Sequence, residues 1–279
     1  MIAARSLVLA ATLLVTVGGC RGGASGPKVT LRYHPPAGAA YHYTLDQQNA
    51  VRIEGGPMSA LPEQTFRMRI YYTQRVQGPT KNGVTVTVTF DSTSLDAPGM
   101  GAGAMQPALD RMHVLSAVFT GLTGAPSPVT EQLASSMKSM AYALPEGPVG
   151  VGDSWVAEHE LPLGQQFNAS QALKSRTKMT VKEIQIAGAD TAVLLDVETT
   201  FPDEPITLTQ QGEGGAPPQT GTLRLSGNLS GEQLFSISRS AQVRAMMGGT
   251  IKMKRGTAGQ PPVTISMTQQ TSLQLTEAK

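Results

Sequence analysis

Apolar and polar residues alternate with a period of two along most of this 279-residue chain. Such alternation is typical of β-strands that have one buried and one solvated face. Asn82-Gly83 lies between two alternating stretches and predicts a tight hairpin turn. The chain is therefore predicted to form a mainly β fold, either a curved antiparallel sheet or an open half-barrel. Strands are expected at 29–33, 41–45, 66–72, 84–90, 155–161, 179–186, 193–201, 223–229, 234–239, 243–247, 251–253 and 263–275.

The middle of the chain has a different period. Residues 97–105 lack alternation and are expected to form a loop, after which apolar residues recur at helical spacing. Ser127 and Pro128 are typical of the start of a second helix, and Pro145 would end it. We therefore expect two amphipathic helices, inserted at about 104–144 within a single β-rich domain of residues 29–279. Their apolar stripes are Met105, Leu109, Met112, Leu115 and Phe119, and then Val129, Leu133, Met137, Met140 and Leu144.

The N-terminus has the features of a bacterial lipoprotein signal peptide. Arg5 precedes an apolar run from Leu7 to Val17, and small residues then lead to Cys20. The run is too short for a spanning helix, which needs about 20 apolar residues. A plain secretory signal would explain the run but not the position of the cysteine. We expect removal of residues 1–19, acylation of Cys20, and a flexible tether over residues 20–28.

Composition narrows the classes of function. Cys20 is the sole cysteine, so an acylated chain would have neither a disulfide nor a thiolate metal site. Basic and acidic residues are nearly balanced, 22 against 20, which gives no reason to expect a nucleic-acid partner. We expect no cofactor and no metal site, because the four histidines are dispersed along the chain. They are His34, His42, His113 and His159.

Two stretches resemble a family of uncharacterised bacterial lipoproteins. One runs from Leu31 to Tyr43, and the other runs from Leu144 to Trp155 and ends in Gly-Asp-Ser-Trp. The resemblance implies an exported lipoprotein and implies no mechanism. Meandering strands with an inserted helical pair are also similar in architecture to the open half-barrel of periplasmic lipoprotein carriers. Such a similarity concerns the fold and does not determine the function.

Gly152-Asp153-Ser154 invites comparison with serine hydrolases, whose nucleophile needs a base, usually a histidine from later in the chain. The last histidine is His159, only five residues on and in the same predicted strand. A turn that opens a strand explains these residues better, so we expect no enzymatic activity and no catalytic residues. A serine hydrolase remains the remote alternative.

The methionines on the helical stripes suggest a binding surface. Methionine is flexible and polarizable, and it suits surfaces that repack around varied apolar partners. Packing of the helices into an ordinary core is the alternative. We expect a lipid-anchored envelope protein that binds a lipid, an acyl chain or a partner protein, on the outer membrane facing the periplasm rather than on the inner membrane. A structural or interaction module without a ligand cavity is the other hypothesis. The candidate ligand contacts are Met105, Met112, Met137 and Met140.

Overall fold

The computed structural model describes residues 26–56, 59–80, 83–98, 117–120, 144–161, 173–187, 190–210, 219–257 and 261–279. These residues form one antiparallel sheet of ten strands, with the order β4-β3-β2-β1-β10-β9-β8-β7-β6-β5. The strands are β1 (Ala40–Glu54), β2 (Gln64–Thr80), β3 (Gly83–Asp96), β4 (Ala117–Thr120), β5 (Ser154–Leu161), β6 (Leu173–Ala187), β7 (Asp190–Gln210), β8 (Gln219–Ser236), β9 (Ala241–Thr257) and β10 (Val263–Ala278).

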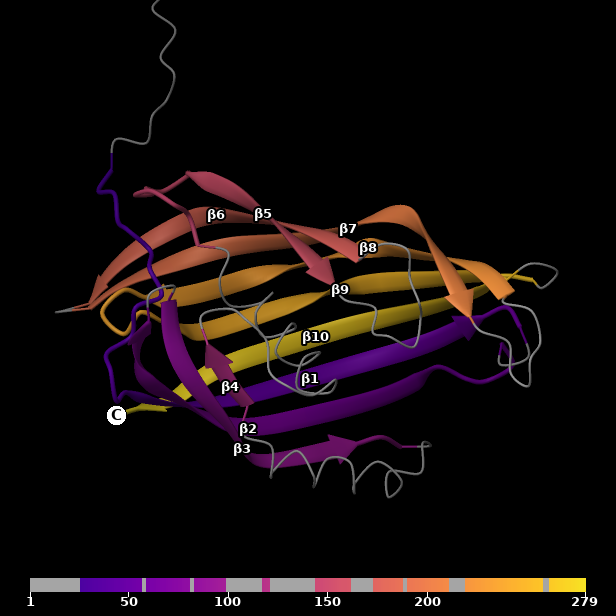
Figure 1. The fold of residues 1–279 in the computed structure, drawn as a ribbon, viewed down its shortest axis with the longest axis horizontal. Helices are drawn as coiled ribbons and strands as arrows, with labels where there is room; N and C mark the ends of the chain where they lie inside the picture. Colours follow the sequence, from indigo (N-terminus) through magenta and orange to yellow (C-terminus); the bar gives the residue numbers. More distant parts are fainter. Residues whose placement is uncertain are drawn as a thin grey trace, which may run out of the picture.

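The sheet is a meander that joins the first long strand to the last one. β1 pairs with β10 over most of their lengths, from Tyr41 opposite Ala278 to Glu54 opposite Thr264. Within the described residues, β4 and β5 lie at the two edges and do not pair with each other, so the sheet is curved but open (Figure 1). The predicted mainly β, antiparallel and open architecture is therefore confirmed.

One face of the sheet carries the apolar core, and we call it the concave face. Its residues alternate with outward-facing polar ones, as the period of two predicts. Two clusters share the end of the sheet where the chain enters, one centred on Tyr43 and Tyr72 and the other on Val193 and Leu195. A third cluster, around Leu208 and Leu223, lies toward the other end.

The segment before β1 packs against both halves of the sheet. The side chain of Leu31 is only 1% exposed and belongs to the cluster around Val193. Tyr33 packs two residues later against the cluster around Tyr43. Val29 forms an isolated antiparallel bridge with Val149, so the strand predicted at 29–33 is wrong except for this bridge. This segment is held against the two halves of the sheet by its buried side chains, so it does not require the hydrogen-bond ladder of a strand.

Glycines allow β8 and β9 to approach each other closely. A Cβ on Gly231 would overlap the carbonyl oxygen of Met246 and lie 2.8 Å from its carbonyl carbon. Gly227 and Gly249 have φ angles of +124° and +157°, and a Cβ on either would strike the backbone of the opposite strand. Glycine inside a strand commonly marks a bend or a close backbone approach. These glycines are therefore a local cause of the curvature of the sheet.

Two further predictions about elements need correction. Ala117–Thr120 forms strand β4, which pairs with β3, so the helix predicted to extend through Phe119 is wrong at its C-terminal end. β-Branched and aromatic residues in this stretch favour a strand, and apolar spacing over a few residues does not separate the two states. The described residues contain no helix. Leu144, the last residue of the second predicted helix, is not helical, and the rest of the two predicted helices lies outside the described residues.

The strand predicted at 234–239 ends at Ser236, because Ile237–Ser240 forms the turn between β8 and β9. Ser240 has a positive φ of 48°, a value that is common in turns and rare in strands. In the part of the chain that the structure describes, no helix is long and apolar enough to cross a bilayer.

Candidate functional site

The concave face has two apolar parts that are separated by a band of polar side chains. Toward the entry end, Leu45 on β1 is opposite Ile70 on β2 and Leu273 on β10. Toward the other end, Val51 is opposite Met267, and Ile53 is opposite Ile265. Because strand residues two apart share a face, the residues between Leu45 and Val51 that face the same way are at positions 47 and 49. Both of these residues are polar.

We call the polar group at this point the central polar cluster, and it consists of Gln47, Asn49, Gln269 and Thr271. Gln47 is opposite Thr271, and Asn49 is opposite Gln269, across the β1–β10 ladder. Gln47 Nε2 donates a hydrogen bond to Asn49 Oδ1 at 3.2 Å, and Gln269 Nε2 donates to Thr271 Oγ1 at 2.8 Å. The cluster thus places four hydrogen-bonding side chains in the middle of a face that is otherwise largely apolar.

Asn49 is the most buried member of the central polar cluster, with 4% of its surface exposed. Its Oδ1 accepts the bond from Gln47, while its Nδ2 has no hydrogen-bond partner. Buried amide donors are almost always paired, since an unpaired one costs about 1–3 kcal/mol. A donor without an acceptor at this position is therefore a candidate for ligand recognition.

The polar band continues on the far side of the curve. Thr177 on β6 and Thr199 on β7 share a hydrogen bond of 2.9 Å between their hydroxyl oxygens. Ser175 and Thr177 are both buried, and His159 on β5 is opposite Ser175. Between these strands and β10, Gly249 on β9 is opposite Gln269 and Gly231 on β8 is opposite Met247, and neither glycine carries a side chain.

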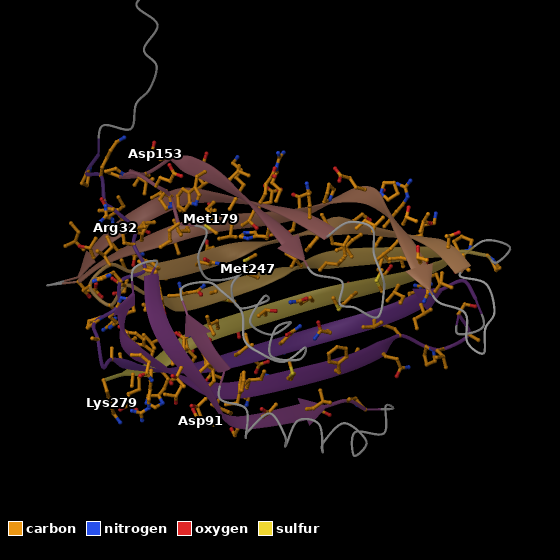
Figure 2. All side chains as sticks on the ribbon, viewed as in Figure 1. Arg32, Asp91, Asp153, Met179, Met247 and Lys279 are labelled. Atoms are coloured by element: carbon orange, nitrogen blue, oxygen red, sulfur yellow. The ribbon has the colours of Figure 1, made fainter. Side chains whose placement is uncertain are left out.

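Methionines lie on the concave face, but the structure places different ones there from those that the sequence suggested. Met179 on β6 is 3% exposed, and Met247 on β9 packs against the same cluster. Figure 2 labels both residues, Met179 on β6 and Met247 on β9. Their alternation with polar residues could have identified them. The predicted contacts lie outside the described residues, and they are Met105, Met112, Met137 and Met140.

An aromatic group closes the entry end of the concave face. The rings of Tyr43 and Tyr72 are stacked with centroids 5.2 Å apart, and Phe90 is tilted against Tyr72 at 6.4 Å. Burial raises the pKa of Tyr43 well above its ordinary value, and burial likewise raises the pKa of Tyr72. These phenols are neutral at physiological pH and serve as apolar packing.

The Gly-Asp-Ser-Trp motif forms a turn that starts a strand. Asp153 Oδ2 accepts a hydrogen bond from the backbone N–H of Gly150 at 2.9 Å and lies 3.5 Å from the ammonium of Lys28. The Gly150 N–H bond is the largest cause that lowers the pKa of Asp153. Ser154 and His159 are five residues apart on β5 and therefore face opposite sides of the sheet. They cannot act as a nucleophile and its base.

The outer face of the sheet carries two polar groups. Asp46 accepts paired hydrogen bonds from Arg67 and Arg69, with distances from 2.7 to 2.9 Å, and these bonds lower the pKa of its carboxyl group. Thr73 Oγ1 donates to Asp91 Oδ2 at 2.7 Å and lies 2.9 Å from His42 Nδ1. Since the hydroxyl has one hydrogen, His42 Nδ1 is the donor in the second bond.

A hollow of about 400 Å³ lies on the outer face beside Arg67. Its lining residues are both polar and apolar, and they are Gln48, Asn49, Ala50, Thr65, Phe66, Arg67, Asp96, Pro98, Thr268 and Gln270. Arg67 and Asp96 are opposite each other on β2 and β3, so the hollow presents balanced charge.

The predicted histidines are not brought together by the fold. His34 precedes β1, His42 faces outward on β1, His159 lies on β5 at the edge of the sheet, and His113 is outside the described residues. No group of three or more metal-ligating side chains occurs among the residues whose positions are described.

The chain matches no protein-family model and no curated protein. The resemblance to uncharacterised lipoproteins therefore stays a prediction.

Proposed function

We propose that this chain is a lipid-anchored protein of the cell envelope that binds a lipid or an acyl chain against the concave face of its sheet, without enzymatic activity. The observation that carries the proposal is the open sheet, whose concave face holds apolar side chains at both ends. An up-and-down sheet that curves without closing gives a long apolar molecule a surface to lie along.

The anchor fits this arrangement. Val29 and Lys279 both lie at the entry end of the sheet, where Val29 bridges Val149 and Lys279 pairs with Ala40 (Figure 1). Residues 20–28 span at most about 30 Å when fully extended. Acylation of Cys20 would therefore hold the entry end close to a membrane, with the end of the sheet at Thr257 and Val263 directed away. The absence of acidic residues directly after Cys20 favours the outer membrane, with the domain in the periplasm.

Native mass spectrometry of protein made in bacteria tests the ligand. All described contacts lie between residues 26 and 279, so a chain that starts at residue 20, with Cys20→Ser, keeps them. We expect a copurified mass that solvent extraction identifies as a lipid. Met247→Glu, on the concave face, should abolish it, whereas Met246→Glu, at a side chain that is 60% exposed, should not. A protein that stays empty when a lysolipid is offered would contradict lipid binding.

Membrane attachment has a separate test. We expect the native protein to start at Cys20, to carry acyl chains and to sediment with membranes, and we expect Cys20→Ala to lose all three properties. Mass analysis of the N-terminal peptide measures this. A cytosolic protein that keeps residues 1–19 and a free thiol would overturn the anchor.

A protein partner is the second candidate function. β5 lies at an edge of the sheet, and its outward Val156 is 53% exposed. Edge strands can pair with a strand of another chain. Crosslinking from position 156 in cells should give one dominant protein adduct if this function is the correct one, and no adduct if the ligand is a lipid alone.

A further inference from the structure

The orientation of the Asn49 side chain is fixed by its neighbour. Gln47 Nε2 donates to Asn49 Oδ1, so Asn49 Nδ2 must be directed away from Gln47. The residue is buried, and Nδ2 has no hydrogen-bond partner. Asn49 is therefore a preoriented donor in need of an acceptor, near the middle of the ten-strand sheet.

The surroundings of Asn49 restrict the acceptor to an uncharged one. Along β1 its neighbours on the concave face are Gln47 and Val51, and across the ladders it is opposite Phe66 and Gln269. None of these side chains carries a charge. A carboxylate or phosphate buried here would lose its hydration without gaining a cation, which is costly, whereas a carbonyl oxygen would lose little.

The position of Asn49 along the strand defines the rest of the ligand. Apolar side chains precede the central polar cluster at Leu45 and follow it at Val51 and Ile53. A molecule that lies along β1 would thus meet apolar surface, then a hydrogen-bond donor, then apolar surface again. A plain hydrocarbon would leave the donor unpaired, and a molecule with a terminal polar group would leave one apolar part uncovered.

We propose that the ligand of the concave face is an acyl ester or acyl amide, and that Asn49 Nδ2 donates a hydrogen bond to its carbonyl oxygen. This inference rests on the proposed function and adds the chemical class of the lipid. The inference predicts that the concave face binds ester-linked and amide-linked lipids more tightly than ether-linked lipids or free hydrocarbon.

Paired probes test the inference. A lysophosphatidylcholine with one ester-linked chain and its ether analogue differ by a single carbonyl oxygen. We expect the chain that starts at residue 20 to bind the ester about five- to tenfold more tightly, the effect of one net hydrogen bond. Asn49→Leu should bind both probes with equal affinity. Gln48→Leu, whose side chain is exposed on the outer face, should keep the preference.

Each outcome has a definite meaning. If the unmodified sequence binds both probes equally, or if Asn49→Leu keeps the ester preference, this inference is overturned while the proposed function stands. If neither probe binds, the proposed function fails and the inference fails with it. The ester-to-ether ratio of the unmodified sequence needs no variant, so it decides the matter even if Asn49→Leu does not fold.

Discussion

Replacing Gly231 by alanine is the sharpest test of how the sheet is bent. Gly231 lies on β8 opposite Met247 of β9. An added methyl group would overlap the carbonyl oxygen of Met246, and it would lie 2.8 Å from the carbonyl carbon of Met246 and 2.9 Å from the Cα of Met247. All three contacts are backbone atoms, so no side-chain rotation relieves them. The two strands must move apart at the middle of the sheet.

The expected change in the free energy of unfolding is the sum of two opposing effects. Alanine inside a strand ordinarily stabilises the folded protein by about 0.5–1 kcal/mol relative to glycine, because the unfolded chain with alanine has less conformational entropy to lose on folding. Separating β8 from β9 weakens one or two ladder hydrogen bonds at about 1 kcal/mol each, and overpacking adds about 1–3 kcal/mol. We expect a net loss of about 3 kcal/mol, a large part of the 5–15 kcal/mol typical of a whole domain.

Urea unfolding measures this loss as a lower midpoint with an unchanged slope. Gly147→Ala is the matched control, because no atom lies within 4 Å of the position of its added methyl group. The control should stay within about 0.5 kcal/mol of the unmodified protein. If Gly231→Ala were as stable as that control, close approach of the two backbones would not be the reason for the glycine.

Two further predictions concern charge and pH. Asp46→Asn should cost about 1 kcal/mol at neutral pH, because it removes the carboxylate that two arginines bind. Those bonds hold the pKa of Asp46 below its ordinary value, so its contribution is present above about pH 4 and is lost as the pH falls through the folded-state pKa. Urea unfolding at several pH values checks this, and a constant difference at all pH values would contradict it. Burial raises the pKa of Tyr72, so the stability that its neutral form contributes is present up to about pH 10 and is lost at higher pH. Ultraviolet titration of Tyr72→Phe should therefore lack a phenol that ionises late in the unmodified protein, and an unchanged titration curve would refute this.

Much of the fold could be predicted from local pattern. The residues Tyr41, Tyr43 and Leu45 do share the buried face of β1, and Trp155 and Ala157 share that of β5. The prediction of these faces was correct because a strand with one buried face has apolar residues at every second position, and this alternation is visible in the sequence.

The order of the strands could not be predicted, because pairing between distant strands leaves no local mark. β1 and β10 are neighbours in the sheet but stand at opposite ends of the chain. The lengths of β8 and β9 were also underestimated, since glycines and polar residues interrupt their alternation. Interruptions of this kind are typical of strand ends, but in β8 and β9 they lie inside continuous strands, at the bend and the polar band of the sheet.

The candidate site was missed for a related reason. Gln47 and Asn49 continue the inward register of Tyr43 and Leu45, so their positions were accessible from the alternation. A polar residue at an inward position is normally taken as the end of a strand. Only the pairing with Gln269 shows that the strand continues and that the polar residues gather in one place.

The bend and the candidate site come from neighbouring residues, which links the shape of the sheet to its proposed ligand. Gly249 on β9 is opposite Gln269 of the central polar cluster, and Gly231 on β8 is opposite Met247. A residue with a side chain at either glycine would push β8 and β9 apart. These two positions carry no side chain, and Met247, which is opposite Thr271 of the central polar cluster, is the side chain that β9 places beside the cluster on the concave face. A long molecule that lies along β1 and contacts Asn49 would therefore have the bent part of β9 beside it, one strand beyond β10, so that the residues that curve the sheet also shape the surface on that side of the ligand.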